Sequence, residues 1–553
     1  MPIISEAEQR QVLSFCGNKS DYPRDKSIVD LFEEQVKLFS DKTALFYKNE
    51  SFSYSWLNIQ SSRLARTLLD LKITKNTPIG ILSDKSPDMI VGLLAILKAG
   101  GTYVPIDPDY PKLRIEFLVK DSGCKILFVD SGHLDLEIEG VKKIHLNESG
   151  NYVNDHLAPE NIAGSDDIAY IMYTSGTTGT PKGCMISHRG VIRLVRNTNF
   201  ITIQPEDKIL STGASVFDAI TFEIWGSLLN GASLYLVEND IILNPKKLED
   251  ELIKNNISIL WLTSSLFTQI VSIQPNIFRV LKYLIVGGDV LSANHINIVR
   301  ENNPQLKVIN GYGPTENTTF TTTFLINRHY DHSIPIGKPI NNSTVYIFDE
   351  NMNYQPIGVI GELFVGGDGL SKGYINREDL NRICFIEHPG IPGERLYRTG
   401  DFGSWLPDGN IEFHGRKDSQ LKFNGIRIET GEIEAHICKL EGVKEAVVKL
   451  NKFDNSDDRL VAFLNTHESF KTGKDEIIKL LKRTLPAFMV PSYFEIVSEF
   501  PLLPNGKVNR SELVYKNTGD LLRDSEQTNT ISETEKKLFV ICFEPGNKFN
   551  YSV

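Results

Sequence analysis

The segment at 173–182, Tyr-Thr-Ser-Gly-Thr-Thr-Gly-Thr-Pro-Lys, constrains the fold of this chain more than any other stretch of its sequence. It follows apolar residues at 168–172 that predict a strand. Its two glycines lack a Cβ atom, so the backbone can turn tightly and point several N–H and O–H donors toward one anion, and Lys182 adds a positive charge. The segment predicts a phosphate-binding loop at the end of a strand. A Ser/Thr/Gly connector without a ligand would have a similar composition.

The first 410 residues alternate between strand-like and helix-like segments. We expect buried strands at 78–83, 125–130, 233–237, 257–262, 284–286 and 306–309. Apolar residues at helical spacing predict helices between them, for example at 89–98. This alternation predicts an α/β fold with layered, largely parallel sheets. Ligands bind at the carboxyl ends of strands in such folds, and the turns after 286 and 309 are glycine-rich like the loop at 173–182.

The pattern changes near 415–418, where a smaller unit begins. Strands are expected at 446–450, 460–464 and 493–497, with a helix at 475–483, which predicts an α+β domain of about 100 residues. A chain of 553 residues also exceeds what one hydrophobic core usually supports. We therefore expect a large domain at 1–417, a small mobile domain at 418–515, and a linker with a carrier-like segment at 516–553.

Charge and composition exclude several classes of protein. A formal net charge of −11 argues against a nucleic-acid-binding surface. The six cysteines are scattered without metal-ligand spacing, which is typical of reduced thiols. The N-terminal residues do not form a signal peptide, and no apolar run is long enough to span a bilayer. We expect a cytoplasmic protein with no membrane or nucleic-acid partner.

Four charged residues are candidates for direct roles. Glu316 closes a turn after a strand and suits a divalent cation, because Mg²⁺ takes few carboxylates and shares the substrate's phosphates. Asp401 suits two ribose hydroxyls, and Lys507, in a Pro/Asn/Gly loop, suits the charge that develops during attack on phosphorus. Asp218 lies among apolar residues and needs a partner, either a substrate ammonium or an internal Arg or Lys. Taken singly, Glu316 and Lys507 are equally compatible with surface turn residues.

Further motifs accompany these residues in one order along the chain. They are Leu-Lys-Ala-Gly-Gly-Thr-Tyr-Val-Pro at 97–105, the loop at 173–183, Phe-Asp-Ala at 217–219, Asn-Gly-Tyr-Gly-Pro-Thr-Glu at 310–316, Gly-Glu-Leu at 361–363, Tyr-Arg-Thr-Gly-Asp at 397–401, Gly-Arg-Lys-Asp at 415–418, Phe-Asn-Gly-Ile-Arg-Ile-Glu at 423–429 and Asn-Gly-Lys at 505–507. With this set the chain resembles the amino-acid adenylation domains of nonribosomal peptide synthetases. That family belongs to the superfamily of acyl-CoA synthetases and beetle luciferases. The similarity extends from about residue 52 to residue 510.

The resemblance implies a two-step reaction that uses ATP and Mg²⁺. An amino acid carboxylate attacks the α-phosphate of ATP, which gives aminoacyl-AMP and pyrophosphate, and the acyl group then passes to the phosphopantetheine thiol of a carrier protein. Lys507 would bridge carboxylate and phosphate, Thr315 would contact the α-phosphate and Glu316 would hold Mg²⁺. The implied hinge between the two steps is Asp418. The implied nucleotide-binding residues are Thr174, Ser175, Gly176, Thr177, Thr178, Gly179, Lys182, Gly288, Asn310, Gly311, Tyr312, Asp401, Phe413 (where many relatives have Tyr) and Arg416.

The resemblance also implies which residues select the substrate. Asp218 would pair with the α-ammonium, and Lys507 would contact the carboxylate. The side-chain pocket would comprise Ala219, Phe222, Trp261, Ile285, Gly287, Gly311, Thr319 and Phe320. No charged residue faces the substrate side chain, and the set is similar to one associated with L-valine. Phe222 and Trp261 could instead be ordinary core residues.

Two other functions remain to be separated from this one. A fatty or aryl acyl-CoA ligase of the same superfamily would leave the carboxylate of Asp218 against an uncharged carbon. A non-catalytic nucleotide-binding module would not need Lys507, Glu316 and Asp401 together. The segment at 532–542 resembles the first helix of a carrier protein, but no Gly-Gly-x-Ser attachment site follows, so we expect a carrier in trans.

Overall fold

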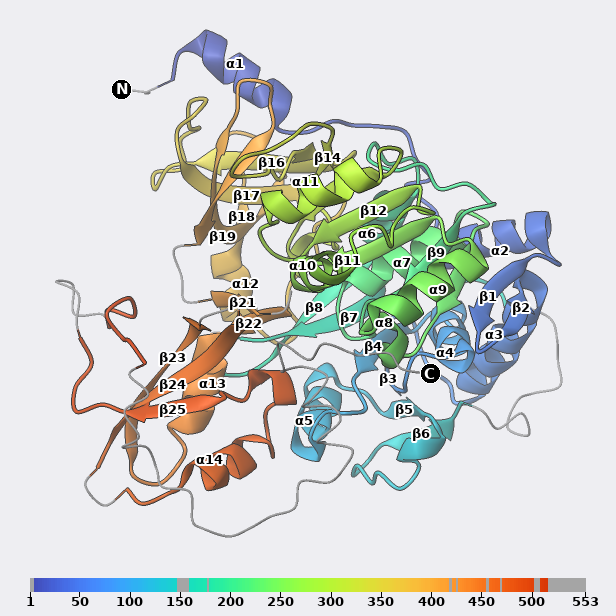
Figure 1. Cartoon of the computed structure of the whole chain (residues 1–553). Coiled ribbons are helices and arrows are strands. Elements are labelled where there is room, and N and C mark those ends of the chain that lie inside the picture. Colours follow the sequence, from blue (N-terminus) through green and yellow to red (C-terminus); the bar gives the residue numbers. More distant parts are fainter. Residues whose placement is uncertain are drawn as a thin grey trace, which may run out of the picture.

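The computed structural model describes residues 4–146, 159–176, 179–416, 420–423, 426–453, 457–467, 470–501 and 508–515 (Figure 1). Thr177, Thr178, Asp418, Lys507 and the carrier-like segment at 516–553 lie outside these ranges. The expected boundary at 417/418 falls there too, so it stays a prediction, as does the mobility of the small domain.

The first sheet carries the phosphate-type loop at one of its strand ends. Its six strands have the order β6 (Lys142–His145), β5 (Ile126–Val129), β3 (Pro78–Leu82), β4 (Thr102–Ile106), β7 (Ile168–Thr174) and β8 (Lys182–Ser187). All neighbours pair in parallel except β7 and β8, which are antiparallel. The loop therefore connects two adjacent strands at the carboxyl end of β7.

The second sheet carries the other glycine-rich turns. Its nine strands have the order β15 (Lys338–Pro339), β14 (Thr322–Ile326), β13 (Lys307–Tyr312), β12 (Tyr283–Gly287), β11 (Ile259–Thr263), β9 (Lys208–Ser211), β10 (Ser233–Leu236), β1 (Thr43–Tyr47) and β2 (Glu50–Ser53). The strands from β13 to β1 are parallel, and antiparallel strands lie at both edges. The α/β fold with layered, largely parallel sheets is thus confirmed.

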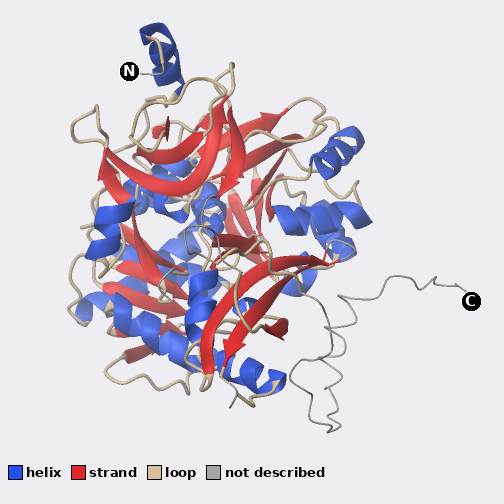
Figure 2. Ribbon diagram, turned by 90° about the vertical axis from the view of Figure 1, so that its left-hand side faces the viewer, coloured by secondary structure: helices blue, strands red, loops and turns tan. Residues whose placement is uncertain are grey.

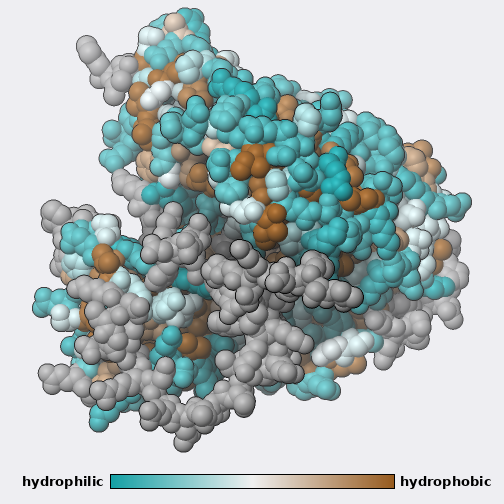
Figure 3. All heavy atoms as spheres, viewed as in Figure 1, coloured by the Kyte–Doolittle hydropathy of each residue, from teal (hydrophilic) through white to brown (hydrophobic). Residues whose placement is uncertain are grey.

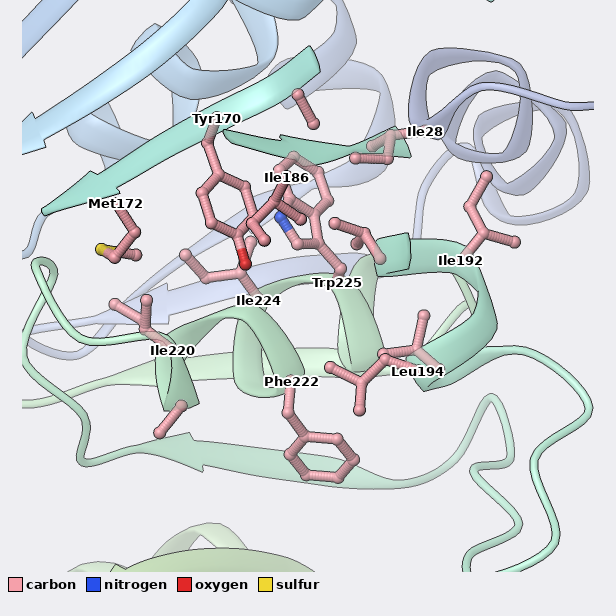
Figure 4. Packing of buried hydrophobic residues seen from close by; sticks show 14 of the residues in the cluster. Ile28, Tyr170, Met172, Ile186, Ile192, Leu194, Ile220, Phe222, Ile224 and Trp225 are labelled. Atoms are coloured by element: carbon pink, nitrogen blue, oxygen red, sulfur yellow. The ribbon is translucent and has the colours of Figure 1, made fainter. Parts of the chain in front are cut away.

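A layer of helices shares one hydrophobic core with both sheets: α2 (Ile28–Phe39), α3 (Tyr54–Asp70), α4 (Pro87–Lys98), α6 (His188–Val195) and α7 (Ala219–Leu228). Every residue of α7 is buried, as expected for a helix that is apolar on all sides. Ile224 and Trp225 of α7 lie toward Tyr170 of β7, whereas Phe222 points away from it (Figure 4). Helix α7 therefore contributes side chains to both faces of this layer.

Other helices cover the outer faces of the two sheets. Residues of α5 (Lys112–Ser122) share a core cluster with the first sheet. The outer face of the second sheet is covered by α8 (Asn239–Ile242), α9 (Pro245–Asn255), α10 (Ser264–Ile273) and α11 (Ala293–Asn302). Helix α1 (Glu6–Phe15) precedes these layers. Figure 3 shows a largely hydrophilic face with small hydrophobic patches, and no helix in the described ranges is long and apolar enough to cross a membrane.

The segment at 343–416 departs from the expected alternation. It forms an antiparallel sheet of β16 (Ser343–Phe348), β17 (Gly361–Gly367), β18 (Phe385–Glu387), β19 (Arg395–Trp405) and β20 (Ile411–Arg416), with one short helix, α12 (Glu378–Cys384). A tight turn connects β19 to β20, with Gly409 at φ +79°. Its Leu-Pro-Asp-Gly-Asn sequence is a hairpin signal, which specifies antiparallel pairing.

The C-terminal unit has its own small core, as predicted for an α+β domain. Figure 2 shows the helices and strands of the described chain together. A hairpin of β21 (Gln420–Phe423) and β22 (Ile426–Glu429) precedes α13 (Thr430–Ile437). The remaining elements are β23 (Val443–Phe453), β24 (Asp457–Thr466), α14 (Lys474–Leu481) and β25 (Tyr493–Ile496). Strand β23 pairs antiparallel with β24, and β25 pairs parallel with β24.

Candidate active site

A cavity of about 290 Å³ lies where the two parallel sheets, the antiparallel sheet and the C-terminal hairpin meet. Many of the residues that the sequence predicted for the site line it: Thr174, Ser175, Asp218, Ala219, Trp261, Gly288, Gly311, Tyr312, Thr315, Thr319, Phe320, Asp401 and Arg416. Gly176, Gly179, Lys182, Phe222, Ile285, Gly287, Asn310, Glu316 and Phe413 are not among the lining residues. The structure thus gathers turns from several strand ends around one space.

The phosphate-type loop needs its glycines for steric reasons. A Cβ atom on Gly176 would lie 1.9 Å from the carbonyl oxygen of Thr180, and Gly179 has φ +82°. The Thr174 hydroxyl is buried and has no hydrogen-bond partner among the described residues. The Ser175 hydroxyl donates to the Arg427 carbonyl at 3.0 Å and accepts from the Glu429 N–H at 3.0 Å. The C-terminal hairpin therefore packs directly on this loop.

Glu316 lies in a single turn, η3 (Thr315–Asn317), and is fully buried. Its carboxylate accepts from the Tyr374 hydroxyl at 2.5 Å and from Arg427 at 2.9 Å, and Lys182 Nζ lies 3.6 Å away. Burial acts to raise the pKa of Glu316, but the positive charges of Arg427 and Lys182 outweigh burial and lower it to about 2. Glu316 is therefore an ionised carboxylate at neutral pH.

Asp218 begins α7 and lines the cavity. Burial raises its pKa to about 6, opposed by a hydrogen bond from Thr315 and reinforced by the charge of Glu316. Among the described residues, no Lys, Arg or His nitrogen lies within 4.0 Å of this carboxylate. The charge of Arg427 acts on Asp218 from beyond that distance and favours the ionised form, so in the described part of the chain Asp218 has a distant internal cation but no direct ion-pair partner.

Glu223, also on α7, shapes the turn that carries Asp218. Its buried carboxylate accepts from the Ser211 hydroxyl at 2.8 Å and from the N–H groups of Thr212 and Gly213 at 3.0 and 3.1 Å. These bonds hold the backbone N–H groups that follow β9. Strand β9 therefore ends at Ser211, although the sequence pattern at 209–215 predicts a strand over the whole segment.

Asp401 joins the antiparallel sheet to the cavity. Its two oxygens accept from Arg416 at 2.7 Å and from the Tyr312 hydroxyl at 2.6 Å. The rings of Tyr312 and Phe413 lie 6.0 Å apart. Asn310 is turned to the Pro335 carbonyl, to which its amide donates at 2.9 Å. Asp401, Tyr312 and Arg416 thus form one polar wall of the cavity.

The opposite part of the cavity is apolar. Trp261 and Phe320 line it, and the buried indole N–H of Trp261 finds no hydrogen-bond partner in the described part of the chain. Phe222 lies behind Phe320, with ring centroids 5.8 Å apart. A Cβ atom on Gly311 would lie 2.7 Å from the Phe320 ring, so glycine is what lets this ring approach the strand.

Sequence reasoning missed several residues at the site. Arg427 belongs to a motif used for the resemblance, but nothing in the sequence connects it with Glu316, 111 positions earlier. Tyr374 has no sequence signal. Lys422 Nζ lies 5.8 Å from the ring centroids of both Tyr312 and Phe413, and Phe488 and Met489 of the C-terminal unit also line the cavity.

Comparisons with known proteins agree with this architecture. The family model described as AMP-binding enzyme matches residues 32–375, and that described as AMP-binding enzyme C-terminal domain matches 432–507. Gramicidin S synthase 2 of Brevibacillus brevis is 46% identical over 539 residues, which cover 97% of this chain but only 12% of that protein.

Solved structures are also similar. An NRPS protein containing adenylation and PCP domains has a TM-score of 0.77 at 30% identity, with 86% of this chain and 95% of that chain covered. A four-domain nonribosomal peptide synthetase bound to AMP and glycine has a TM-score of 0.68 at 28% identity, covering 96% of this chain and 39% of that chain.

Proposed function

This chain belongs to the AMP-binding enzyme family of ATP-dependent, AMP-forming ligases, and we propose that it activates L-valine. In this proposal valine and ATP give valyl-AMP and pyrophosphate, and the valyl group then passes to the phosphopantetheine thiol of a carrier domain. The chain is an adenylation domain of the nonribosomal peptide synthetase type, which activates an amino acid. What we propose beyond amino-acid activation is the choice of valine and the transfer of the valyl group to a carrier domain.

The observation that carries the proposal is the environment of Asp218. Burial and the charge of Glu316 disfavour the ionised form of this carboxylate, which lines the cavity and has no Lys, Arg or His nitrogen of the described residues within 4.0 Å, although the more distant charge of Arg427 partly opposes them. An α-ammonium group would neutralise it, as a buried charge requires. A carboxylic acid without an amino group would leave it unpaired, which argues against a fatty or aryl substrate.

The polar residues fit ATP with Mg²⁺. The unpartnered Thr174 hydroxyl and the glycine-rich loop offer donors to phosphate oxygens. Glu316, which here is bound by Tyr374 and Arg427 and does not line the cavity, would have to exchange one of these contacts to share Mg²⁺ with phosphate oxygens, since Mg²⁺ takes few carboxylates. Bound Mg²⁺ would neutralise charge on the phosphates during attack.

The roles of individual residues follow from this arrangement. Asp218 would orient the amino acid through its ammonium group, and Asp401 with Tyr312 and Arg416 would hold the ribose. Thr174 and Ser175 would contact phosphate, with Lys182 supporting Glu316. Lys507, on a loop outside the described residues, would bridge the two reacting groups, and rotation about Asp418 would remove it before the thiol enters.

The apolar wall supports a small branched side chain. Trp261 and Phe320 line the cavity and limit the length of the substrate side chain. Phe222 and Ile285 are fully buried, and none of these four side chains is charged. Discrimination between valine and isoleucine would depend on one methylene group, about 1–3 kcal/mol. Some activity with isoleucine and leucine is therefore expected.

Amino-acid-dependent exchange of pyrophosphate into ATP tests the first step. We expect exchange with valine to exceed that with the nineteen other standard amino acids, and no exchange with 3-methylbutanoate, which has a similar carbon skeleton but no amino group. Exchange with 3-methylbutanoate alone would favour the acyl-CoA ligase. Transfer of labelled valine to a holo carrier domain, with the apo carrier as control, tests the second step.

A further inference from the structure

The backbone that connects Glu316 to the substrate pocket adopts an unfavourable conformation. Thr318 and Thr319 follow η3 with φ values of +52° and +65°. Two successive β-branched residues in the left-handed region are rare, because their Cβ substituents crowd the backbone. Such a conformation persists only where surrounding contacts impose it.

This bend connects the two halves of the site. Thr315 and Glu316 lie immediately before it, and Thr319 and Phe320 line the cavity. The Thr319 hydroxyl also donates to the Asp218 carbonyl at 2.8 Å. A change in the bend would therefore displace Glu316 and the apolar wall of the cavity together.

Arg193 on α6 is the cation that holds the bend. Its side chain is 1% exposed. Its guanidinium donates to the carbonyls of Asn317 at 2.7 Å, Thr318 at 3.3 Å and Phe320 at 2.7 Å. A fourth bond, of 3.0 Å, goes to the Ser343 hydroxyl. Only a planar guanidinium presents this many donors in a fixed fork.

The opposite side of the bend is closed by a glycine. The Thr318 hydroxyl donates to the Gly369 carbonyl at 2.7 Å, and a Cβ atom on Gly369 would lie 1.8 Å from the Arg193 guanidinium. Arg193 itself does not line the cavity. Its burial among neutral acceptors is costly, and no step assigned above uses it.

We propose that Arg193 is a positioning residue that imposes the left-handed bend at Thr318 and Thr319 and thereby sets the enzyme's selectivity for a small branched side chain. The inference rests on the proposed function and extends it. Wild-type enzyme without amino-acid-dependent exchange would contradict the proposed function, whereas the variants below test Arg193 in an active enzyme.

The main variant is Arg193→Met, with Arg196→Met as matched control. Arg196 lies three residues further on and also donates to backbone, at 2.6 Å to the Leu229 carbonyl, but it contacts no part of the bend. We expect Arg193→Met to raise KM for valine and for MgATP, and to reduce the ratio of kcat/KM for valine over leucine at least fivefold. Arg196→Met should leave that ratio within twofold of wild type.

A glycine at position 318 distinguishes a positioning role of Arg193 from a general loss of stability. Glycine adopts positive φ freely, so adding Thr318→Gly to Arg193→Met should recover a substantial part of the lost selectivity, although it removes a hydrogen bond. If Arg193→Met does not fold, Arg193→Lys with and without Thr318→Gly provides the same comparison. Unchanged selectivity in the Arg193 variant, or no recovery with Thr318→Gly, would overturn the proposal.

Discussion

Replacing Asp218 by Asn tests the reasoning about this site most directly. The pKa of Asp218 rises from 3.8 to about 6 on folding. A difference of about two pKa units, at 1.36 kcal/mol per unit, corresponds to about 3 kcal/mol by which the ionised carboxylate destabilises the ligand-free protein. Because Asp218 lines a cavity open to water, this value is an upper limit. We therefore expect Asp218→Asn to be more stable than wild type at neutral pH, by up to about 3 kcal/mol.

The sign of the pH dependence follows from linkage. A carboxyl group with a raised folded-state pKa binds its proton more tightly in the folded protein, so its cost is absent below about pH 4, grows between about pH 4 and 6, and is complete above. The advantage of Asp218→Asn should therefore be largest near pH 8 and vanish near pH 4. Over the same range, wild-type KM for valine should rise as the pH falls through about 6.

Tryptophan fluorescence during urea unfolding measures this difference, since all four tryptophans (positions 56, 225, 261 and 405) precede the C-terminal unit. Valine-dependent exchange should fall at least about 100-fold in Asp218→Asn, because the substrate ammonium loses its charged partner. Asp88→Asn is the matched control. Burial also raises the pKa of Asp88, but Asp88 lies outside the cavity, so exchange should be unchanged.

Two results would refute the reasoning: an Asp218→Asn protein less stable than wild type near pH 8, or one that retains exchange within twofold of wild type. The first would mean that an internal cation already stabilises Asp218. The second would mean that the substrate has no ammonium group at this position.

The other predictions concern the apolar wall, Glu316 with its partner Arg427, Lys507 and Mg²⁺. Trp261→Ala enlarges the apolar wall, so the preferred substrate in exchange assays should shift from valine to leucine or phenylalanine, by about 10- to 200-fold in relative kcat/KM; an unchanged profile would place Trp261 outside the side-chain pocket. Arg427→Met leaves buried Glu316 with Lys182 as the one nearby cation that the described residues provide, so the melting temperature without nucleotide should fall, with a loss of about 3–5 kcal/mol; a melting temperature equal to wild type would contradict this. Lys507→Ala should slow exchange at least about 100-fold while transfer from synthetic valyl-AMP to a holo carrier proceeds at close to the wild-type rate; equal loss in both steps would contradict its assigned role. Removal of Mg²⁺ with a chelator should abolish exchange, and restored Mg²⁺ should recover it.

The fold could be predicted where a segment's own pattern determines its structure. The apolar runs at 78–83 and 125–130 form β3 and β5 within one residue at each end. The prediction failed at 343–416, where the turns of an antiparallel sheet were read as part of an α/β alternation. It also failed at residues 212–215, which have a strand-like pattern. There the N–H of Thr212 donates to the carboxylate of Glu223, eleven residues later in the chain, and not to a neighbouring strand.

The candidate site could be predicted only as far as motifs extend. Thr174, Asp218 and Asp401 were chosen from their motifs and Trp261 from the family resemblance, and the structure brings all four around one cavity. Arg193 could not be found in this way, because an arginine within an apolar helix segment gives no sign of the three carbonyls to which it donates more than 120 residues later. The roles of Lys507 and Asp418 stay predictions.

The complete burial of α7 limits how this enzyme could change its substrate. Phe222 belongs to a helix in which every residue is buried against the two sheets or another helix. A side chain of different size at this position would therefore require residues in several layers to repack. Trp261, in the middle of β11, and Thr319, in a turn, both line the cavity, so a smaller side chain at either position opens onto that space. We therefore expect new specificities, in the laboratory and in evolution, to arise first at Trp261 and Thr319, with Phe222 changing only after compensating substitutions in its surroundings.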